Sequence, residues 1–221
     1  MRKYKLNENY FEQINTEDKA YWLGFIAADG CIVSCSKQTK SLRLRINIHE
    51  KDEEYLIKFK KCIEGNMPIK KFKSNKGKRF ESNQVKIDIN SNKLCEDLIK
   101  VGVNFRKTFD LKMPNVPYDL VVHFIRGYFD GDGCISKYII KGTDKYRFTF
   151  EIVGQSEDIL IYFQDYFKKN NITVNLYTRK SNNSKRLMIC SKRELIKIYH
   201  LFYDECNICM ERKMNIFKQL L

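Results

Sequence analysis

The chain of 221 residues lacks the marks of several common protein classes. It has only three histidines, His49, His123 and His200, and their spacing forms no cluster, which disfavours a histidine-based nuclease. It contains neither a P-loop signature nor the GxSxG turn of a serine hydrolase. A long apolar run and a basic amphipathic helix are both missing, which argues against a membrane partner. No apolar stretch follows the charged residues 1–10, so we expect no signal peptide.

Acidic residues are scarce relative to basic ones. The chain has 41 Lys and Arg against 27 Asp and Glu, a formal net charge of +14. Such a balance in a globular chain favours a polyanionic partner, most often nucleic acid. Hydrophobic residues at 43% and aromatic residues at 13% are sufficient for packed cores, so wholesale disorder is not expected.

The eight cysteines are expected to be free thiols in a reducing intracellular compartment, either the cytoplasm or an organelle matrix. Cys206 and Cys209 have the spacing of half a zinc site, but no second CxxC pair accompanies them. A structural zinc ion is therefore disfavoured. Cys31 and Cys134 each follow the glycine of a repeated motif, and we expect them to be small buried residues that open a strand.

Two segments of the chain resemble each other. Residues 22–30 read WLGFIAADG and residues 125–133 read IRGYFDGDG, about half the chain length apart. Each predicts a short apolar helix that ends in an acidic residue and a glycine. A repeat at this period indicates a duplicated unit. Two of the three prolines, Pro114 and Pro117, lie near the midpoint, so we expect a first repeat over 1–110, a linker over 111–118 and a second repeat over 119–221.

The two halves also share a pattern of periodicity. Alternating apolar and polar residues predict strands, and helical spacing predicts amphipathic helices between and after them. Each half therefore predicts an α-β-β-α-β-β-α unit, an α+β fold with antiparallel sheets. One face of each sheet is expected to be covered by helices and the other to be basic. The segments concerned are strands at 42–48, 85–89, 147–152 and 186–189, and helices at 52–63, 92–101, 157–167 and 192–203.

Small residues lie four positions apart in both motif helices, at Gly24 and Ala28 and at Gly127 and Gly131. Residues at this spacing share one helix face, and small side chains let two backbones approach closely. Packing on these stripes would bring Asp29 and Asp132 face to face, where they would repel each other unless a cation lay between them. Oxygen ligands of this kind suit Mg²⁺. The alternative is an acidic residue and a glycine that merely end a helix, but two symmetric copies in a basic chain favour the cation site.

Both motifs, and residues 123–133 most clearly, resemble those of the LAGLIDADG homing endonucleases in their single-chain, two-motif form. The resemblance covers nearly the whole chain. It implies a monomer with pseudo-two-fold symmetry, motif helices at the domain interface and saddle-shaped sheets that grip the major groove of duplex DNA. It also implies mobility of a host intron or intein. Asp29 and Asp132 would bind Mg²⁺, or another divalent cation such as Mn²⁺ or Ca²⁺, and the backbone carbonyls of Ala28 and Gly131 are possible additional ligands.

The resemblance extends to two further pairs of repeat-equivalent positions. Lys107 and Lys213 resemble the family's active-site lysine, which would lie near the scissile phosphates and stabilise developing charge. The alternative is an ordinary phosphate-contacting or helix-terminal lysine. His49 and Gln155 would order water around the metals. The family usually has an acid two residues before the metal ligand, and Asp130 keeps it while Ala27 does not. We infer that the halves have diverged, which fits a long and partly asymmetric DNA target.

Polar residues on the predicted strand faces, and in a hairpin that includes residues 181–186, are candidates for contacts with DNA bases or phosphates. The alternative is a solvated strand face, which the net charge makes less attractive. These candidates are Arg43, Arg45, Asn47, Lys86, Asn90, Arg147, Thr149, Tyr177, Arg179, Lys180 and Lys185.

The function that we expect is site-specific, metal-dependent hydrolysis of both strands of duplex DNA. Each acid and its lysine would serve one strand, with no covalent enzyme intermediate. Two alternatives remain open, an RNA maturase that helps an intron to splice and a DNA-binding regulator that does not cleave. Retention of both Asp29 and Asp132 argues against the regulator but not against the maturase.

Overall fold

The computed structural model describes residues 3–35, 41–74, 81–104, 111–154, 156–178 and 184–221. The chain divides into two compact α+β units. The first comprises Met1–Ile14 and Asp29–Phe105, and the second comprises Asn15–Ala28 and Arg106–Leu221. The body of the first motif helix thus belongs to the same compact unit as the second repeat. Among the described residues, no helix is both long and apolar enough to cross a bilayer.

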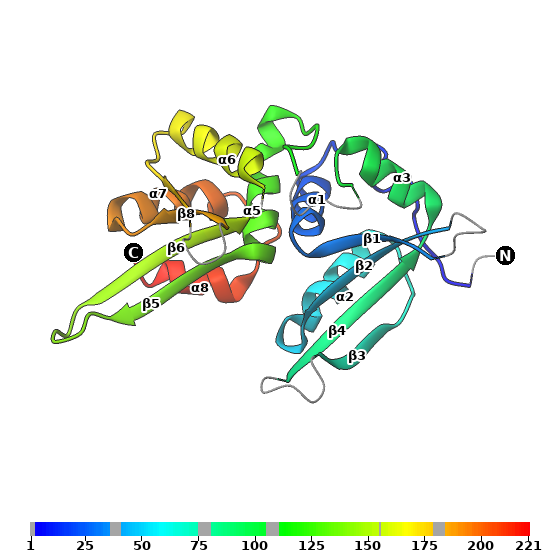
Figure 1. Ribbon diagram of the computed structural model, residues 1–221, viewed down its shortest axis with the longest axis horizontal. Coiled ribbons are helices and arrows are strands. Elements are labelled where there is room, and N and C mark those ends of the chain that lie inside the picture. Colours follow the sequence, from blue (N-terminus) through cyan, green and yellow to red (C-terminus); the bar gives the residue numbers. More distant parts are fainter. Residues whose placement is uncertain (1–2, 36–40, 75–80, 105–110, 155, 179–183) are drawn as a thin grey trace. The chain divides into compact units, whose positions relative to one another are not determined.

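The first unit contains a four-stranded antiparallel sheet in the order β1-β2-β4-β3 (Figure 1). A short 3-10 turn, η1 (Glu50–Asp52), leads into the first of two helices that accompany the sheet. The second of these helices begins after Ser91, whose side chain accepts a hydrogen bond from the Leu94 amide, and ends before Gly102, which has a φ of 120°. The bounds are β1 (Gly30–Ser34), β2 (Leu42–His49), α2 (Glu53–Cys62), β3 (Ile69–Ser74), β4 (Ser82–Asn90) and α3 (Asn92–Val101).

The second unit repeats this plan, with its sheet in the order β5-β6-β8-β7. It also contains α1 (Glu17–Asp29), except for the last residue of that helix. The remaining bounds are η2 (Tyr118–Leu120), α5 (Val121–Asp132), β5 (Gly133–Ile139), β6 (Tyr146–Gly154), α6 (Glu157–Lys169), β7 (Asn175–Thr178), β8 (Lys185–Ile189), α7 (Lys192–Tyr203) and α8 (Glu211–Lys218). The predicted duplicated α-β-β-α-β-β-α unit is confirmed, and α8 is an additional helix.

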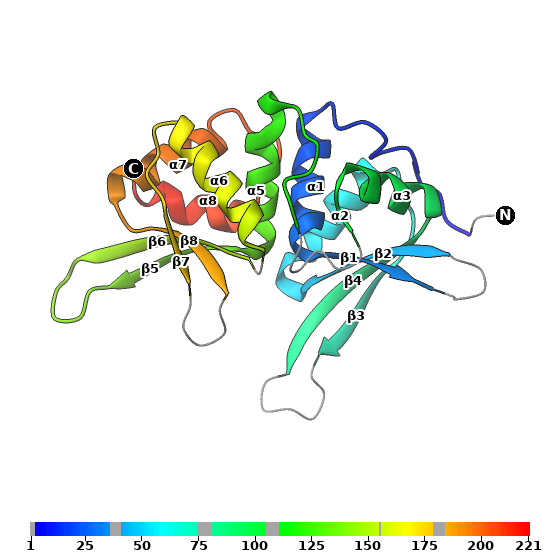
Figure 2. The ribbon, with the colours of Figure 1, turned by 45° about the horizontal axis from the view of Figure 1, so that its top comes forward.

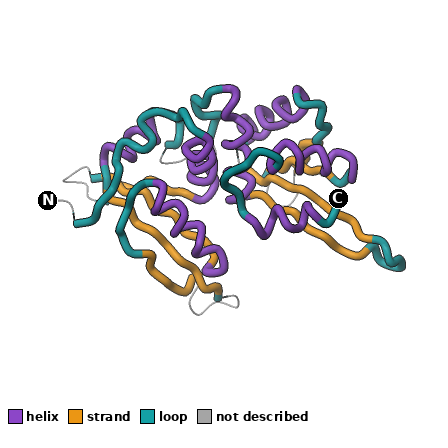
Figure 3. The backbone as a smooth tube through the Cα atoms, turned by 180° about the vertical axis from the view of Figure 1, so that it is seen from behind, coloured by secondary structure: helices purple, strands orange, loops and turns teal. Residues whose placement is uncertain are grey.

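Helices cover one face of each sheet (Figures 2 and 3). In the first unit, α3 contacts β2 and α2 contacts β4. In the second, α5 and α8 contact β5, while α6 contacts β6 and β8. The strand residues beneath these helices are buried and apolar because side chains alternate between the two faces of a strand. They are Leu44, Ile46, Ile48, Val85, Ile87 and Ile89 in the first unit and Phe150, Ile152, Leu187 and Ile189 in the second.

The expectation that Cys31 and Cys134 are buried is wrong. Both thiols are exposed. Cys31 pairs with Arg45 and Cys134 pairs with Glu151, so each cysteine lies on the polar face of its sheet. Strand register, which the motif glycine alone does not determine, decides the face on which they lie.

Helices α1 and α5 approach each other at two glycines of the motif stripes. A Cβ atom added to Gly24 would lie 2.0 Å from the backbone oxygen of Phe124, and one added to Gly127 would lie 1.9 Å from that of Tyr21. Both obstacles are backbone atoms of the partner helix, which no rotamer change can move. The contact therefore needs a residue without a side chain on each helix.

A buried ionic network ties this helix pair to residues 204–210, the segment between α7 and α8. Arg126 of α5 is 1% exposed and donates hydrogen bonds to the backbone oxygens of Phe202 and Ile208 and to the carboxylate of Glu17 of α1. Glu17 also accepts hydrogen bonds from the backbone and side-chain nitrogens of Asn207, at 2.9 and 2.6 Å. Burial raises the pKa of Glu17, but the bonds from Asn207 and the charge of Arg126 outweigh this effect, so its pKa lies below the ordinary value.

Asp130 makes a second link between the same elements. It is 1% exposed, and its Oδ2 accepts hydrogen bonds from the Tyr21 hydroxyl of α1 and from the Met210 amide at the start of α8, both at 2.7 Å. Burial raises the pKa of Asp130, an effect that Lys213, Tyr21, Met210 and Arg126 partly offset. One carboxylate thus joins three helices.

Substitution of Gly24 or Gly127 by Ala tests the helix contact. Gly to Ala inside a helix normally stabilises by about 1 kcal/mol. Here the methyl group would meet partner backbone, and we expect each variant to lose about 3 kcal/mol of unfolding free energy. Urea denaturation measures the change. Gly154→Ala is the control, because its Cβ would meet no atom closer than 3.4 Å. A stabilising effect at Gly24 or Gly127 would contradict the packing.

Substitution of Asp130 by Ala tests the second link. The change leaves the buried Tyr21 hydroxyl and Met210 amide without their acceptor, at a cost of about 1–3 kcal/mol for each. Tyr21→Phe is the matched control, since it removes one hydrogen bond while Met210 still serves Asp130, and it should cost about 1 kcal/mol. Equal losses of unfolding free energy in the two variants would rule out the three-helix link.

Candidate metal and nucleic-acid site

Each motif acid is the last residue of its helix. Asp29 ends α1 and is half-buried, and Asp132 ends α5 and is exposed. The first strand of each sheet begins at the next residue, where Gly30 pairs with Ile46 and Gly133 pairs with Ile152. A side chain at Gly133 would meet the ring of Phe129 at 2.1 Å, which explains the glycine. The sequence repeat therefore places both acids at equivalent corners between a helix and a strand.

These corners favour a cation on electrostatic grounds. The C-terminal end of a helix carries partial negative charge, and basic residues are normally preferred there. Neither α1 nor α5 has a basic residue in its last turn, and both end in an acid. At each corner the carboxylate and the neighbouring carbonyl, of Ala28 or Gly131, are oxygen donors of the kind that hard divalent cations prefer.

Lys213 supplies positive charge to the end of α5 from outside that helix. It lies in α8, is 3% exposed, and donates to the backbone oxygens of Phe129, Asp130 and Gly133 at 2.6, 2.8 and 2.7 Å. An ammonium group has three N–H donors, so these bonds use all of them. Lys213 thereby positions the corner that carries Asp132, and its predicted role beside a scissile phosphate stays a prediction.

Four of the predicted site residues, Lys107, Gln155, Arg179 and Lys180, lie outside the described residues. His49 is the last residue of β2, and its Nδ1 accepts a hydrogen bond from the Lys51 amide at 3.1 Å. It thereby caps η1. The role of these residues around a metal stays a prediction.

The polar face of the first sheet brings together all five candidates predicted there. Arg43 pairs with Asn90 in the strand register and Asn47 pairs with Lys86. Arg43 Nε donates to Asn90 Oδ1 at 2.6 Å, which orders the guanidinium on the face. The remaining candidate, Arg45, lies in the middle of this row.

Asp88 is an acidic member of this face that sequence reasoning missed. It pairs with Arg45 in the register, and Arg45 Nε lies 2.7 Å from its Oδ1. Burial raises the pKa of Asp88, but the hydrogen bond and charge of Arg45 outweigh this effect and hold the pKa below its usual value. The alternation of strand 85–89 was the signal that could have placed Asp88 beside the basic residues.

A pair of like charges lies at the edge of the same face. Lys70 of β3 is directly opposite Lys86 of β4, and the Lys86 ammonium lies 5.1 Å from the centre of the Phe72 ring. Like charges opposite each other in a sheet are destabilising. Lys70 was missed because IKKFKS has no strict alternation. Binding of a polyanion would relieve the repulsion.

The second sheet has a different polar face. Arg147 and Thr149 lie on it in β6, as predicted, and Tyr177 of β7 pairs with Arg186 of β8. Lys185, predicted in the hairpin, pairs with Gly154 on the helix-covered side, and its Nζ lies 3.2 Å from Glu157 of α6, so its contact with DNA stays a prediction. The neighbouring Arg186 lies on the polar face, where its guanidinium forms an ion pair with Glu151 at 3.3 Å.

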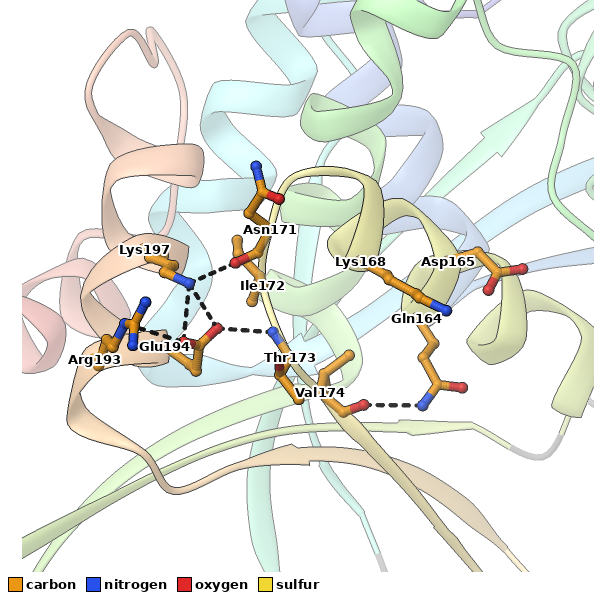
Figure 4. Close-up of a pocket in the computed structure, with 10 residues that line it drawn as sticks. All are labelled: Gln164, Asp165, Lys168, Asn171, Ile172, Thr173, Val174, Arg193, Glu194 and Lys197. Carbon is orange, nitrogen blue, oxygen red and sulfur yellow. Dashed lines mark hydrogen bonds and ion pairs between the residues drawn. The ribbon is translucent and has the colours of Figure 1, made fainter.

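A surface hollow lies between α6, α7 and residues 171–174 (Figure 4). Glu194 accepts hydrogen bonds there from the Thr173 amide and from Lys197, which also donates to the Asn171 backbone oxygen. Among the described residues, no strand residue lines the hollow. These polar groups tie the loop to α7, so the hollow is separate from the strand faces.

The chain is similar to known proteins along both of its repeats. Among solved structures, the LAGLIDADG meganuclease I-AabMI bound to uncleaved DNA is 17% identical, with a TM-score of 0.62, over 90% of this chain and 88% of that chain. The I-LtrWI LAGLIDADG homing endonuclease bound to target DNA is 16% identical, with a TM-score of 0.60, over 97% and 90% of the two chains. The meganuclease I-SmaMI is 12% identical, with a TM-score of 0.63, over 94% and 88%. At these identities the likeness shows the fold alone.

A comparison with curated protein sequences found no match. Family models identify both halves of the chain. The model described as LAGLIDADG endonuclease matches residues 22–107, and the model described as LAGLIDADG-like domain matches residues 119–202. Because one such model matches each repeat and the two matches together span most of the sequence, the chain belongs to the LAGLIDADG homing endonuclease family and carries both motifs in one polypeptide.

Proposed function

We propose that the protein is a site-specific endonuclease that acts as a monomer, binds a long duplex DNA site and hydrolyses both strands with divalent metal. Family membership supports a nuclease. The observation that carries the proposal is the pair of glycine-packed helices, each of which ends in an acid, Asp29 or Asp132.

The donor set fits a magnesium ion. At each helix end the carboxylate and carbonyl oxygens favour a hard cation, and Asp132 is exposed while Asp29 is half-buried. Bound divalent metal would activate water and neutralise the leaving oxygen. The protein's own residues position the acids. Lys213 fixes the backbone where α5 ends and β5 begins, and the glycine contact keeps α1 and α5 packed together.

The strand faces supply the proposed DNA contacts. Arg43, Arg45, Lys70 and Lys86 make the first face basic, and Arg147 and Arg186 contribute to the second. The faces differ in residue type at equivalent places, which supports a target whose two halves are not identical. The excess positive charge would also suit RNA, so the experiment below is designed to distinguish the endonuclease from a maturase.

Asp29→Asn and Asp132→Asn test the catalytic proposal. Each change removes a carboxylate charge with little change in shape, so we expect both variants to lose double-strand cleavage of a randomised duplex library in Mg²⁺. Binding to duplex should be largely kept. Sequencing of the cut ends measures cleavage, and gel shift measures binding.

Asp165→Asn is the matched control for these variants, because this exposed acid lies on α6 and lines only the helix-side hollow. It should cleave as the parent does. Undiminished cleavage by both motif variants would overturn the metal-site assignment. Failure of the parent to cleave with any divalent cation, together with tight binding of structured RNA, would favour the maturase.

Salt dependence tests the basic faces. The logarithm of duplex affinity should fall linearly with the logarithm of salt concentration, because bound phosphates release counterions. Removal of Lys70 or Lys86 by substitution with Ala should reduce that slope by about 1 if each contacts a phosphate. Lys61→Ala, an exposed lysine on α2, is the control and should leave the slope unchanged. A flat salt response of the parent would exclude phosphate contacts at these faces.

A further inference from the structure

Cys206 and Cys209 form a pair that the proposed nuclease does not use. They lie in the segment between α7 and α8, where Cys206 is partly exposed and Cys209 is 8% exposed. Their side chains are hydrogen-bonded to each other, and the Cys209 sulfur also lies 3.9 Å from the sulfur of Met214. No group of three or more metal-ligating side chains occurs among the residues that the structure describes, so nothing there completes a zinc site around this pair.

The two thiols differ in acidity. The hydrogen bond from Cys209 lowers the pKa of Cys206 to about 7, against the effect of burial, and Arg126 of α5 lowers it further. Glu17 of α1 and Asp130 of α5 act in the opposite direction. The same hydrogen bond and burial raise the pKa of Cys209 well above its ordinary value. Near neutral pH Cys206 is therefore the more thiolate-like of the two, which is the nucleophilic form, while Cys209 keeps its proton.

Residues 204–210, which contain both cysteines, are hydrogen-bonded to α1 and α5. Asn207 and Ile208, the two residues between the cysteines, are the ones that bind Glu17 of α1 and Arg126 of α5. Met210, directly after Cys209, donates to Asp130. A covalent bond between the two sulfurs would enclose the residues that hold α1 and α5.

We propose that Cys206 and Cys209 are a thiol–disulfide exchange site whose partner is a low-molecular-weight disulfide such as oxidised glutathione. The Cys206 thiolate attacks one sulfur of the small disulfide, which releases one small thiolate and leaves a mixed disulfide. Cys209 then loses its proton to solvent and attacks the Cys206 sulfur, which releases the second small thiolate. Two protein thiols are oxidised to one disulfide, and the small disulfide is reduced to two thiols. A dithiol in a reducing compartment that forms such a bond is typically a redox-responsive one.

Peptide mass spectrometry after treatment with oxidised glutathione and an acid quench tests this site in the full-length protein. The parent should form a Cys206–Cys209 disulfide that a small dithiol reverses. Cys209→Ser should stop at glutathione bound to Cys206, and Cys206→Ser should react slowly at Cys209. The initial rate in the parent should rise through a midpoint near pH 7, the pKa of Cys206.

Cys190 provides the matched control, because it is exposed and lies in the same unit. Cys190→Ser should form the Cys206–Cys209 bond at the parental rate. In the parent, Cys206 should be alkylated faster than Cys190 below neutral pH, a measurement that does not depend on the folding of any variant. Faster reaction at Cys190, mixed disulfides without internal closure, or stoichiometric zinc that blocks both thiols would each overturn the proposal. None of these readouts requires DNA cleavage.

Discussion

The backbone contact between α1 and α5 is the constraint on which the rest of the second unit depends. Gly24 meets the backbone of Phe124, and Gly127 meets that of Tyr21, at separations that leave no room for a methyl group. Because the helices touch without intervening side chains, their polar residues can reach across the contact. The buried links from Tyr21 to Asp130 and from Glu17 to Arg126 both require this closeness.

A buried guanidinium is costly unless its donors are satisfied. Arg126 meets that requirement with two backbone carbonyls and one carboxylate, all of which come from other elements. The consequence is structural as well as energetic, since these bonds and those from Asn207 to Glu17 anchor the segment between α7 and α8 to α1 and α5. This segment also leads into α8, which carries Lys213 to the corner that ends in Asp132.

Much of the fold follows from local sequence, because the repeat and the alternation of strands such as 42–48 are set by neighbouring residues. The errors lie where tertiary pairing decides. Strand register places Cys31 and Cys134 on the exposed polar faces of their sheets, and it places Arg186, which was not among the candidates, on the polar face of the second sheet. Neither the partners of Lys213 nor the acid–base pair of Asp88 with Arg45 follows from spacing along the chain, since each joins segments far apart in sequence.

The two motifs differ in sequence at positions that face each other in the contact between α1 and α5. Asp130 occupies the position that Ala27 holds in the first repeat, and the hydroxyl that serves Asp130 comes from Tyr21, whose own repeat equivalent is Phe124. Asp130 and Tyr21 thus form a polar pair across the two helices. The repeat-equivalent positions, Ala27 and Phe124, both carry apolar side chains. A buried carboxylate without a donor would be destabilising, and so would a buried hydroxyl without an acceptor. Replacement of both members together removes a polar link without leaving either group unsatisfied. The two halves can therefore differ chemically while the glycine contact that joins α1 and α5 stays the same.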